Sequence, residues 1–270
     1  MKKITYIFLF VAFAITSLTQ AQYGPGGVGD VGSLHLWLKP DGLDFEDGDL
    51  IDIWEDASEN NNPAFQATES NRPTFESSVP GLNGLPGISF SGGTDDSSSS
   101  FMKVLSDPAF DNNINQMDLY ALIRHTDLKP DVQGIISKRT DASSNDYAFT
   151  LFKWTTKNPY ADINGLADGR LEGGNNELSE KKNIWLNSSF DGTQSLSDRH
   201  KLYSNSNLLN SNDPNTDKIT PSVKDITIGV LNENYGQYFA GYIPEIIFFN
   251  SSLNQTQRNI IDNYVAAKFD

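Results

Sequence analysis

The feature that most constrains this fold is an apolar segment near the C-terminus, residues 243–249, with the sequence Ile-Pro-Glu-Ile-Ile-Phe-Phe. Apolar side chains occupy both faces, and only Pro244 and Glu245 interrupt them. A short β-branched and aromatic run, bounded here by Gly and by Asn-Ser-Ser, is typical of a strand buried between two layers. The sequence therefore predicts a strand covered on both faces. The residues expected to be fully buried are Ile243 and Ile247, or Ile246 and Phe248.

A helix signal follows this strand directly. Asn254 can cap a first turn, and Gln257, three residues later, can return a hydrogen bond to it. We expect an amphipathic helix over residues 255–268 that lies against an outer edge of the fold. Its apolar stripe consists of Ile260, Ile261, Tyr264 and Val265.

The N-terminus has the pattern of a secretory signal peptide. Lys2 and Lys3 precede an apolar run over residues 4–18, and small residues, Thr19 and Ala21, stand where a signal peptidase reads the chain. The run is short and a Gly-rich polar stretch follows it, so we expect cleavage after Ala21 rather than a membrane anchor. The predicted organisation is a signal peptide over 1–21, a flexible lead-in over 22–32, and export from the cell with no membrane span in the mature chain.

Charge and cysteine content exclude several classes of function. The formal net charge is −15, and loss of two lysines with the signal makes it more negative still. Such a field repels phosphate backbones, so nucleic acid is not an expected partner. The chain contains no cysteine, which excludes disulfides, thiolate metal sites and a cysteine nucleophile.

Short strand patterns fill the chain between the lead-in and the terminal helix. Leu34, Leu36 and Leu38 alternate with more polar residues. Turns rich in Gly, Asn and Pro separate the later segments. Many short strands with one helix at the end predict an all-β antiparallel sandwich, folded as a single domain over 33–270. Further strands are expected at 118–125, 134–138, 147–154, 183–190, 200–204 and 225–229.

Several motifs occur in an order that resembles a known family. They are Leu36-Trp37-Leu38-Lys39-Pro40-Asp41, Trp54-Glu55-Asp56-Ala57-Ser58-Glu59-Asn60, Arg72-Pro73-Thr74, Leu202-Tyr203-Ser204-Asn205 and Gly241-Tyr242-Ile243-Pro244-Glu245. Together they resemble the laminin-G-like, concanavalin A-like jelly-roll modules of secreted and surface bacterial proteins, over nearly all of the mature chain. The resemblance implies a concanavalin A-like jelly-roll β-sandwich with a short C-terminal helix.

Catalytic patterns are incomplete in this chain. Some jelly-roll glucanases carry three acids at alternate positions of one strand. Here the residues two positions before and after Asp52 are Leu50 and Trp54, so this set of three acids is missing. Residues 238–242 are similar to a segment of certain jelly-roll alginate lyases, without its lysine. The three histidines stand singly, without metal-ligand spacing. No catalytic residue is therefore assigned.

Glu245 is the one acid inside the apolar strand, and a buried carboxylate needs partners. It is either a catalytic or metal-binding acid, or a structural carboxylate that holds backbone donors or an arginine. We favour the structural interpretation.

Calcium is the one cofactor that the residues favour, because it prefers oxygen ligands and the loops are rich in Asp and Asn. The candidate ligands are Asp95 and Asp96, then Asp56 and Asn60. The resemblance also implies calcium, since related jelly rolls often hold it among loops at one edge. The alternative is that these are solvated loop side chains without a metal.

Aromatic side chains are the candidates for ligand binding, since they stack on sugar rings. Trp154, Tyr160 and Trp185 lie in or beside expected strands and have polar neighbours, although packing residues are an alternative for each. We expect a secreted, non-catalytic recognition module that binds carbohydrate or another extracellular or cell-surface component, such as a surface protein. The alternatives are a glycan-active jelly-roll enzyme, a glucanase or polysaccharide lyase, and a purely structural or adhesion domain.

Overall fold

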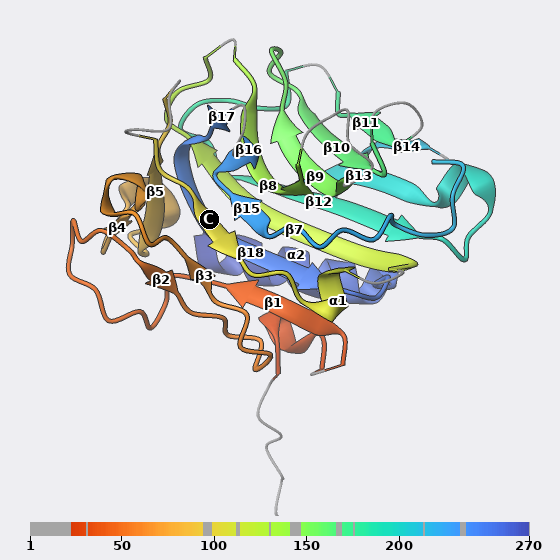
Figure 1. The fold of residues 1–270 in the computed structure, drawn as a ribbon, viewed down its shortest axis with the longest axis horizontal. Coiled ribbons are helices and arrows are strands. Elements are labelled where there is room, and N and C mark those ends of the chain that lie inside the picture. Colours follow the sequence, from red (N-terminus) through yellow and green to blue (C-terminus); the bar gives the residue numbers. More distant parts are fainter. Residues whose placement is uncertain are drawn as a thin grey trace, which may run out of the picture.

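The fold is an antiparallel β-sandwich with a C-terminal helix on one outer face, as the sequence predicts (Figure 1). The computed structural model describes residues 23–269 except 31, 94–98, 112–113, 130, 141–146, 166–168, 175, 213 and 233–235. The expected signal peptide lies outside the described residues. Within them, no helix is both long and apolar enough to cross a membrane.

Two large sheets form the sandwich, each with eight strands among the described residues. The first sheet runs in the order β14 (Asn207–Asn212), β13 (His200–Ser204), β12 (Ile184–Asp191), β7 (Gln116–His125), β18 (Ala240–Phe249), β5 (Gly87–Ser91) and β4 (Thr74–Glu76), with β1 (Leu34–Leu38) also paired to β18. The second runs in the order β11 (Arg170–Glu172), β10 (Pro159–Ile163), β9 (Tyr147–Lys153), β8 (Gln133–Arg139), β15 (Ile226–Ile228), β6 (Met102–Val104), β3 (Ala64–Phe65) and β2 (Ile53–Trp54).

Smaller elements complete the fold. A two-stranded sheet pairs β16 (Val230–Asn232) with β17 (Gly236–Tyr238). The α-helices are α1 (Pro108–Asp111) and α2 (Gln255–Phe269), and the 3₁₀ turns are η1 (Pro25–Gly27), η2 (Glu69–Asn71), η3 (Pro80–Leu82) and η4 (Leu196–Asp198).

The predicted strands appear within a few residues of their expected bounds, but several others were missed. β10 begins at Pro159, which reads as a turn signal but is tolerated as the first residue of a strand. β14 is rich in Asn and Ser and largely exposed, so its sequence carries little strand signal. Pairing with β13 at the edge of the sheet, rather than intrinsic propensity, makes it a strand.

Strand β18 is covered on both faces, because alternate side chains point to opposite sides of the sheet. Ile246 and Phe248 belong to the core between the two sheets, and Ile247 and Phe249 belong to the cluster beneath α2. All four, and Ile243 as well, are fully buried. The prediction of a strand between two layers is confirmed.

Two residues give β18 its irregular start. The pairing register with β7 shifts between Tyr242 and Glu245, and this irregularity accommodates Pro244, which has no N–H for a ladder. Gly241 has φ +140°, and a Cβ there would lie 2.2 Å from the carbonyl oxygen of Arg124. The strand can therefore approach β7 this closely only with glycine at this position.

Helix α2 lies across the outer face of the first sheet (Figure 1), so the prediction of an edge position is wrong. It packs on the middle strands because β7, β12 and β18 all present apolar side chains there. The reciprocal cap is confirmed, with Gln257 N donating to Asn254 Oδ1 (3.0 Å) and Asn254 N to Gln257 Oε1 (2.9 Å). The buried stripe is Ile261, Val265 and Phe269, whereas Ile260 is 39% exposed.

The lead-in differs from the expectation of a flexible segment in its described part. Pro25 and Val28 are buried, and η1 packs on α2. Gly26, at φ +61°, leaves so little room that a Cβ would lie 2.9 Å from the side chain of Ile260. The Tyr23 hydroxyl also donates to the carbonyl of Ser58. The described part of the lead-in thus covers helix α2 next to Ile260.

Glu245 anchors the helix to the sheet. Its side chain is fully buried and accepts hydrogen bonds from Trp37 Nε1 (2.6 Å), Tyr264 OH (2.9 Å) and Lys268 Nζ (2.9 Å). Its partners are side chains of β1 and α2, rather than backbone amides or an arginine. Burial, followed by the Glu245 charge, raises the pKa of Tyr264, so the phenol stays protonated and continues to donate.

We predict that Glu245→Ala lowers the free energy of unfolding by about 3–5 kcal/mol, the usual cost of removing one partner of a buried ion pair. The substitution removes the acceptor of Trp37 and Tyr264 and leaves Lys268 with Asp41 as its remaining carboxylate partner. Guanidinium unfolding measures the change, with Glu46→Ala, an exposed glutamate, as control. A loss no larger than that of the control would show that Glu245 does not hold the helix.

Asp118 makes a second set of buried hydrogen bonds, just before the N-terminus of α2. It is fully buried and accepts from Asn187 Nδ2 (3.0 Å) and from the backbone N of Leu253 (2.7 Å). Burial raises the pKa of Asp118 to about 6, against the opposing effect of these hydrogen bonds.

A raised carboxyl pKa means that the folded state holds a proton that the unfolded state has already lost. Stability from this group is therefore present below about pH 4 and is lost as the pH rises through about 6. The loss is about 3 kcal/mol for a shift of about two units. Urea unfolding of the wild type and of Asp118→Asn from pH 4 to 7 should show the wild type losing stability relative to the variant. Parallel curves for the wild type and Asp118→Asn would contradict the assignment, and Asp44→Asn, at an exposed site, serves as the control substitution.

Candidate functional site

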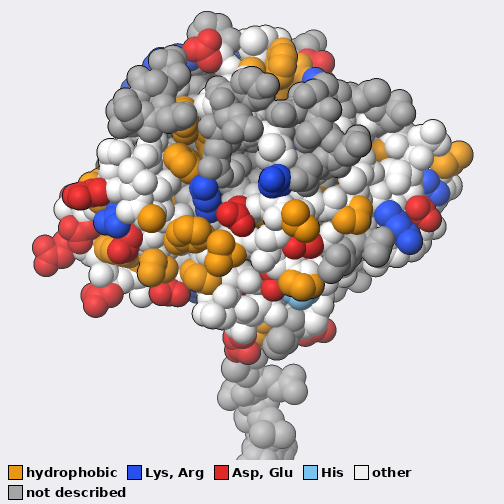
Figure 2. All heavy atoms as spheres, in the orientation of Figure 1, with side chains coloured by type: hydrophobic (Ala, Val, Ile, Leu, Met, Phe, Trp, Pro, Cys, Tyr) orange, Lys and Arg blue, Asp and Glu red, His pale blue; other side chains and the backbone are white. Residues whose placement is uncertain are grey.

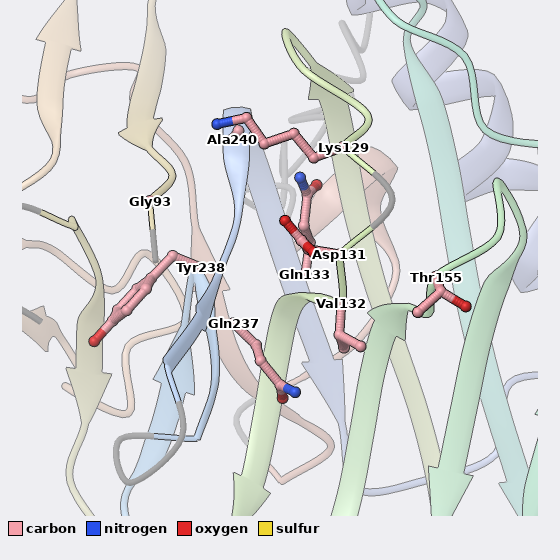
Figure 3. Close-up of a pocket in the computed structure, with 9 residues that line it drawn as sticks. All are labelled: Gly93, Lys129, Asp131, Val132, Gln133, Thr155, Gln237, Tyr238 and Ala240. Carbon is pink, nitrogen blue, oxygen red and sulfur yellow. The ribbon is translucent and has the colours of Figure 1, made fainter. Parts of the chain in front are cut away.

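A pocket of about 270 Å³ lies where loops from both sheets meet, and we call it the loop pocket. Its walls come from separate segments, namely the end of β5, the β7–β8 connection, the residues after β9, and β17 with the start of β18 (Figure 3). The lining residues are Gly93, Lys129, Asp131, Val132, Gln133, Thr155, Gln237, Tyr238 and Ala240.

The loop pocket has a buried floor and a polar rim. The buried residues Val132, Gln133, Tyr238 and Ala240 form the floor. Lys129, Asp131 and Thr155 are exposed at the opening. An apolar floor with a few directional polar groups is the usual composition of a small-molecule site.

Lys153, at the end of β9, holds the walls of this pocket together. Its side chain is buried, and its Nζ donates to the carbonyls of Lys129 (2.6 Å), Asp131 (2.8 Å) and Trp154 (2.9 Å). These bonds use all three donors of an ammonium group. Burial lowers the pKa of Lys153, while Asp131 and Asp127 oppose that shift. One side chain thus ties the β7–β8 connection to the residues that follow β9.

Gln133 is the buried polar side chain of the floor. Its Nε2 donates to the carbonyl of Asp127 (3.0 Å), and this bond fixes the orientation of the amide. Its Oε1 is buried and accepts no hydrogen bond of normal geometry in the described part of the chain, although the His125 ring interacts with this amide. The neighbouring His125 ring is also buried without a hydrogen bond of normal geometry. Burial, followed by the charge of Lys153, lowers the pKa of His125 to about 3, so the ring is neutral at physiological pH.

An aromatic platform adjoins the loop pocket on the outer face of the second sheet, and we define it as Phe152, Trp154, Tyr160 and Arg170. The Phe152 and Tyr160 rings stack at 5.4 Å, and Trp154 meets Phe152 edge-on at 6.1 Å. The Arg170 guanidinium lies 5.4 Å from the centroids of both Phe152 and Trp154. Val132 joins pocket and platform, because it lines the pocket and packs in one cluster with Phe152 and Tyr160.

Asp162 fixes the cation of this platform. It is fully buried and accepts two hydrogen bonds from Arg170, at Nε (2.9 Å) and Nη2 (2.6 Å), and one from Tyr147 OH (2.6 Å). This bidentate geometry raises the pKa of Arg170 and holds the guanidinium in one plane. The positive charge is therefore compensated locally.

The structure brings together two of the three aromatic residues proposed from sequence. Trp154 is 38% exposed beside the loop pocket, and Tyr160 is a largely buried member of the platform. Trp185 lies in the other sheet under α2, where it stacks on Tyr120 at 5.2 Å and its Nε1 donates to Asp262 Oδ1 (3.2 Å). Trp185 therefore takes no part in this site.

The carboxylate of Asp56 organises its own loop. Oδ1 accepts from the backbone N of Trp37 (2.8 Å) and Ser58 (2.9 Å), and Oδ2 accepts from Ser58 Oγ (2.7 Å) and Asn62 N (3.0 Å). Both oxygens are thus occupied by protein donors, and the arrangement does not fit a calcium ligand.

Asn60 uses its amide nitrogen for the carbonyl of Leu34 (2.7 Å). Asp95 and Asp96 lie outside the described residues. Within the described ranges, no group of three or more His, Asp or Glu residues is placed to hold a metal ion. Calcium binding stays a prediction.

Acidic side chains gather elsewhere, at the left of Figure 2, over the part of the molecule that carries β2 and β4. A hollow of about 450 Å³ lies between Asp41, Asp44, Asp52 and Glu55. Its acids are mostly solvated, and the hollow contains no buried polar atom without a partner among the described residues. The loop pocket is therefore the stronger candidate site.

Comparisons with known proteins support the fold. No family model matches this sequence, and no curated protein sequence matches it. Among solved structures, the chain is similar to Trypanosoma rangeli sialidase in complex with sialic acid, with 14% identity and a TM-score of 0.58 over 90% of this chain and 35% of the sialidase. The same sialidase in complex with 2,3-difluorosialic acid, a covalent intermediate, has 15% identity and a TM-score of 0.58, over 91% of this chain and 35% of the sialidase.

A smaller protein, Ruminococcus gnavus IT-sialidase CBM40 bound to α2,3 sialyllactose, gives 15% identity and a TM-score of 0.47 over 68% of this chain and 96% of that chain. The chain spans about a third of the sialidase that it matches. At these identities the sialidase likeness shows the fold alone, and that fold is an all-β antiparallel sandwich.

Sequence reasoning missed Gln133, Tyr238, Arg170 and Lys153 as residues of this region. Only Lys153 carried a usable signal, because it is a lone charge inside an apolar strand, as Glu245 is. Such a charge must find partners when it is buried.

We predict that Lys153→Met loosens the loop pocket while the sandwich stays folded. Methionine preserves the apolar stem and leaves three carbonyls without their donor, at a cost of about 1–3 kcal/mol. Hydrogen exchange should become faster in the β7–β8 connection, and Lys157→Met, at an exposed lysine, should leave it unchanged. Unaltered exchange in Lys153→Met would show that the ammonium does not hold these walls.

Proposed function

We propose that this chain is a secreted, non-catalytic recognition module that binds carbohydrate in the loop pocket. The observation that carries the proposal is the lining itself, which combines amides, a tyrosine, a threonine and an adjoining exposed tryptophan. Sugars present hydroxyl groups that pair with amides and hydroxyls, and C–H faces that pack on aromatic rings. Export rests on the predicted signal peptide.

The composition of the pocket favours binding over hydrolysis. Retaining glycoside hydrolysis typically needs two carboxyl groups about 5 Å apart. Of the lining residues that the structure describes, Asp131 alone carries a carboxylate, and it stands at the exposed rim. The likeness to a sialidase covers about a third of that enzyme, and an enzyme of the glucanase or lyase type remains the alternative that product analysis tests.

A glycan-array screen of the mature protein, followed by product analysis of any polysaccharide it binds, tests the proposal. We expect saturable binding without new reducing ends or unsaturated sugars over time. Release of either product would replace the binding module with an enzyme. Binding to no glycan would leave a structural or adhesion role, or a surface-protein partner.

We predict that Trp154→Ala weakens glycan binding by about tenfold or more. Burying a large apolar side chain is worth about 1.5–3 kcal/mol, and 1.4 kcal/mol is a factor of ten in affinity. Leu196→Ala, an exposed apolar residue on the β12–β13 connection, is the control and should bind as the wild type does. Equal affinities for both variants and the wild type would remove the platform from the site.

A further inference from the structure

We infer that the loop pocket receives one neutral sugar unit at the end of a chain, so that the module recognises chain termini rather than the middle of a polysaccharide. This inference rests on the proposed function and specifies the ligand of the same site. Three observations carry it, namely the shape of the pocket, its charge balance and the buried acceptor on its floor.

The shape favours a single unit. At about 270 Å³, the pocket lies just below the usual range of about 300–1,000 Å³ for small-molecule sites. Its lining residues come from several separate segments, among them the β7–β8 connection, the residues after β9 and the start of β18 (Figure 3). A pocket of this size, lined by several separate segments, has room for a single unit, whereas an open trough along a sheet would accept a chain that continues on both sides.

The charge balance favours a neutral unit. Lys129 and Asp131 stand at the rim, Lys129 Nζ lies 3.4 Å from Asp127 Oδ2, and Lys153 is buried behind the walls. The charges of Lys129 and Lys153 are therefore balanced by those of Asp127 and Asp131. Arg170, the nearest guanidinium of the platform, is held by Asp162. Because no cation is left uncompensated in this group and the whole chain carries −15, an acidic sugar would find no net attraction.

The floor supplies a directional acceptor. Gln133 is 2% exposed, its Nε2 is committed to Asp127, and its buried Oε1 accepts no hydrogen bond of normal geometry in the described part of the chain. The His125 ring beside it interacts with this amide, and a ligand hydroxyl that enters the pocket would replace that poorly aligned contact with a full hydrogen bond. Hydroxyl groups are what a neutral sugar offers at every position around its ring.

The position of Trp154 is consistent with a chain that leaves the pocket in one direction. Thr155 lines the pocket and directly follows Trp154 in sequence. A terminal unit on Gln133 would therefore place its neighbour near the exposed indole. Affinity should rise from one unit to two and change little with further length.

Calorimetry with a panel of neutral saccharides of one to eight units, drawn from the sugars bound on the array, tests the end-on mode. We expect affinity to level off at two units and the number of proteins bound per chain to stay constant as chains lengthen. The matching oligosaccharides that end in a uronic or sialic acid should bind at least tenfold more weakly. Stoichiometry that grows with chain length, or tighter binding of the acidic set, would overturn the inference while leaving carbohydrate recognition intact. Binding of no panel member would overturn both.

Gln133→Leu tests the acceptor. We expect a loss of tenfold or more in affinity, with the melting temperature measured alongside to confirm folding. Gln194→Leu, at an exposed glutamine far along the chain, is the matched control. A monodeoxy sugar that lacks the critical hydroxyl should bind the wild type as weakly as the intact sugar binds the variant, and the two losses should not add. Fully additive losses at every ring position would show that Gln133 contacts no hydroxyl. If Gln133→Leu does not fold, the deoxy series on the wild type decides the point, because equal binding of all members would contradict a hydroxyl contact on the floor.

Discussion

The constraint on which the structure depends is that β18 is apolar on both faces and must be covered twice. The second sheet covers one face through Ile246 and Phe248, and α2 covers the other through Ile247 and Phe249. Glu245 lies on the helix side of the same strand, where Trp37, Tyr264 and Lys268 satisfy it. The terminal helix is thus a third layer that completes the sandwich, and the lead-in closes over part of it.

The same strand sets the place of the candidate site. β18 begins at Ala240, which lines the loop pocket, and its far end carries the helix interface. The rigid middle of the sandwich therefore holds the helix, and its loop end presents the pocket, in line with the general tendency of scaffolds to carry binding residues on loops. Lys153 joins the loop end to the second sheet, because it is anchored in β9 and bonded to the loop carbonyls.

Buried charges recur as fixing points in this molecule. Glu245 positions a helix, Lys153 positions two connections, and Asp162 positions the guanidinium of the platform. Each is satisfied by several donors or acceptors, as a buried charge must be. Burial of such groups specifies one geometry among those that an apolar core alone would permit, and the Glu245 and Lys153 variants test this hypothesis here.

The sequence by itself determined the class of fold, the buried strand, the terminal helix and its Asn254 cap, because periodicity and capping are local properties. It also marked Glu245 as a charge in need of partners. Only the tertiary structure decided which partners those are, since Trp37 lies more than two hundred residues away. It also decided that α2 covers the middle of a sheet, that Asn-rich β14 is a strand, and that Trp154 and Trp185 lie apart. Strand order brings together residues such as Gln133, Thr155 and Tyr238, and no local pattern encodes that order.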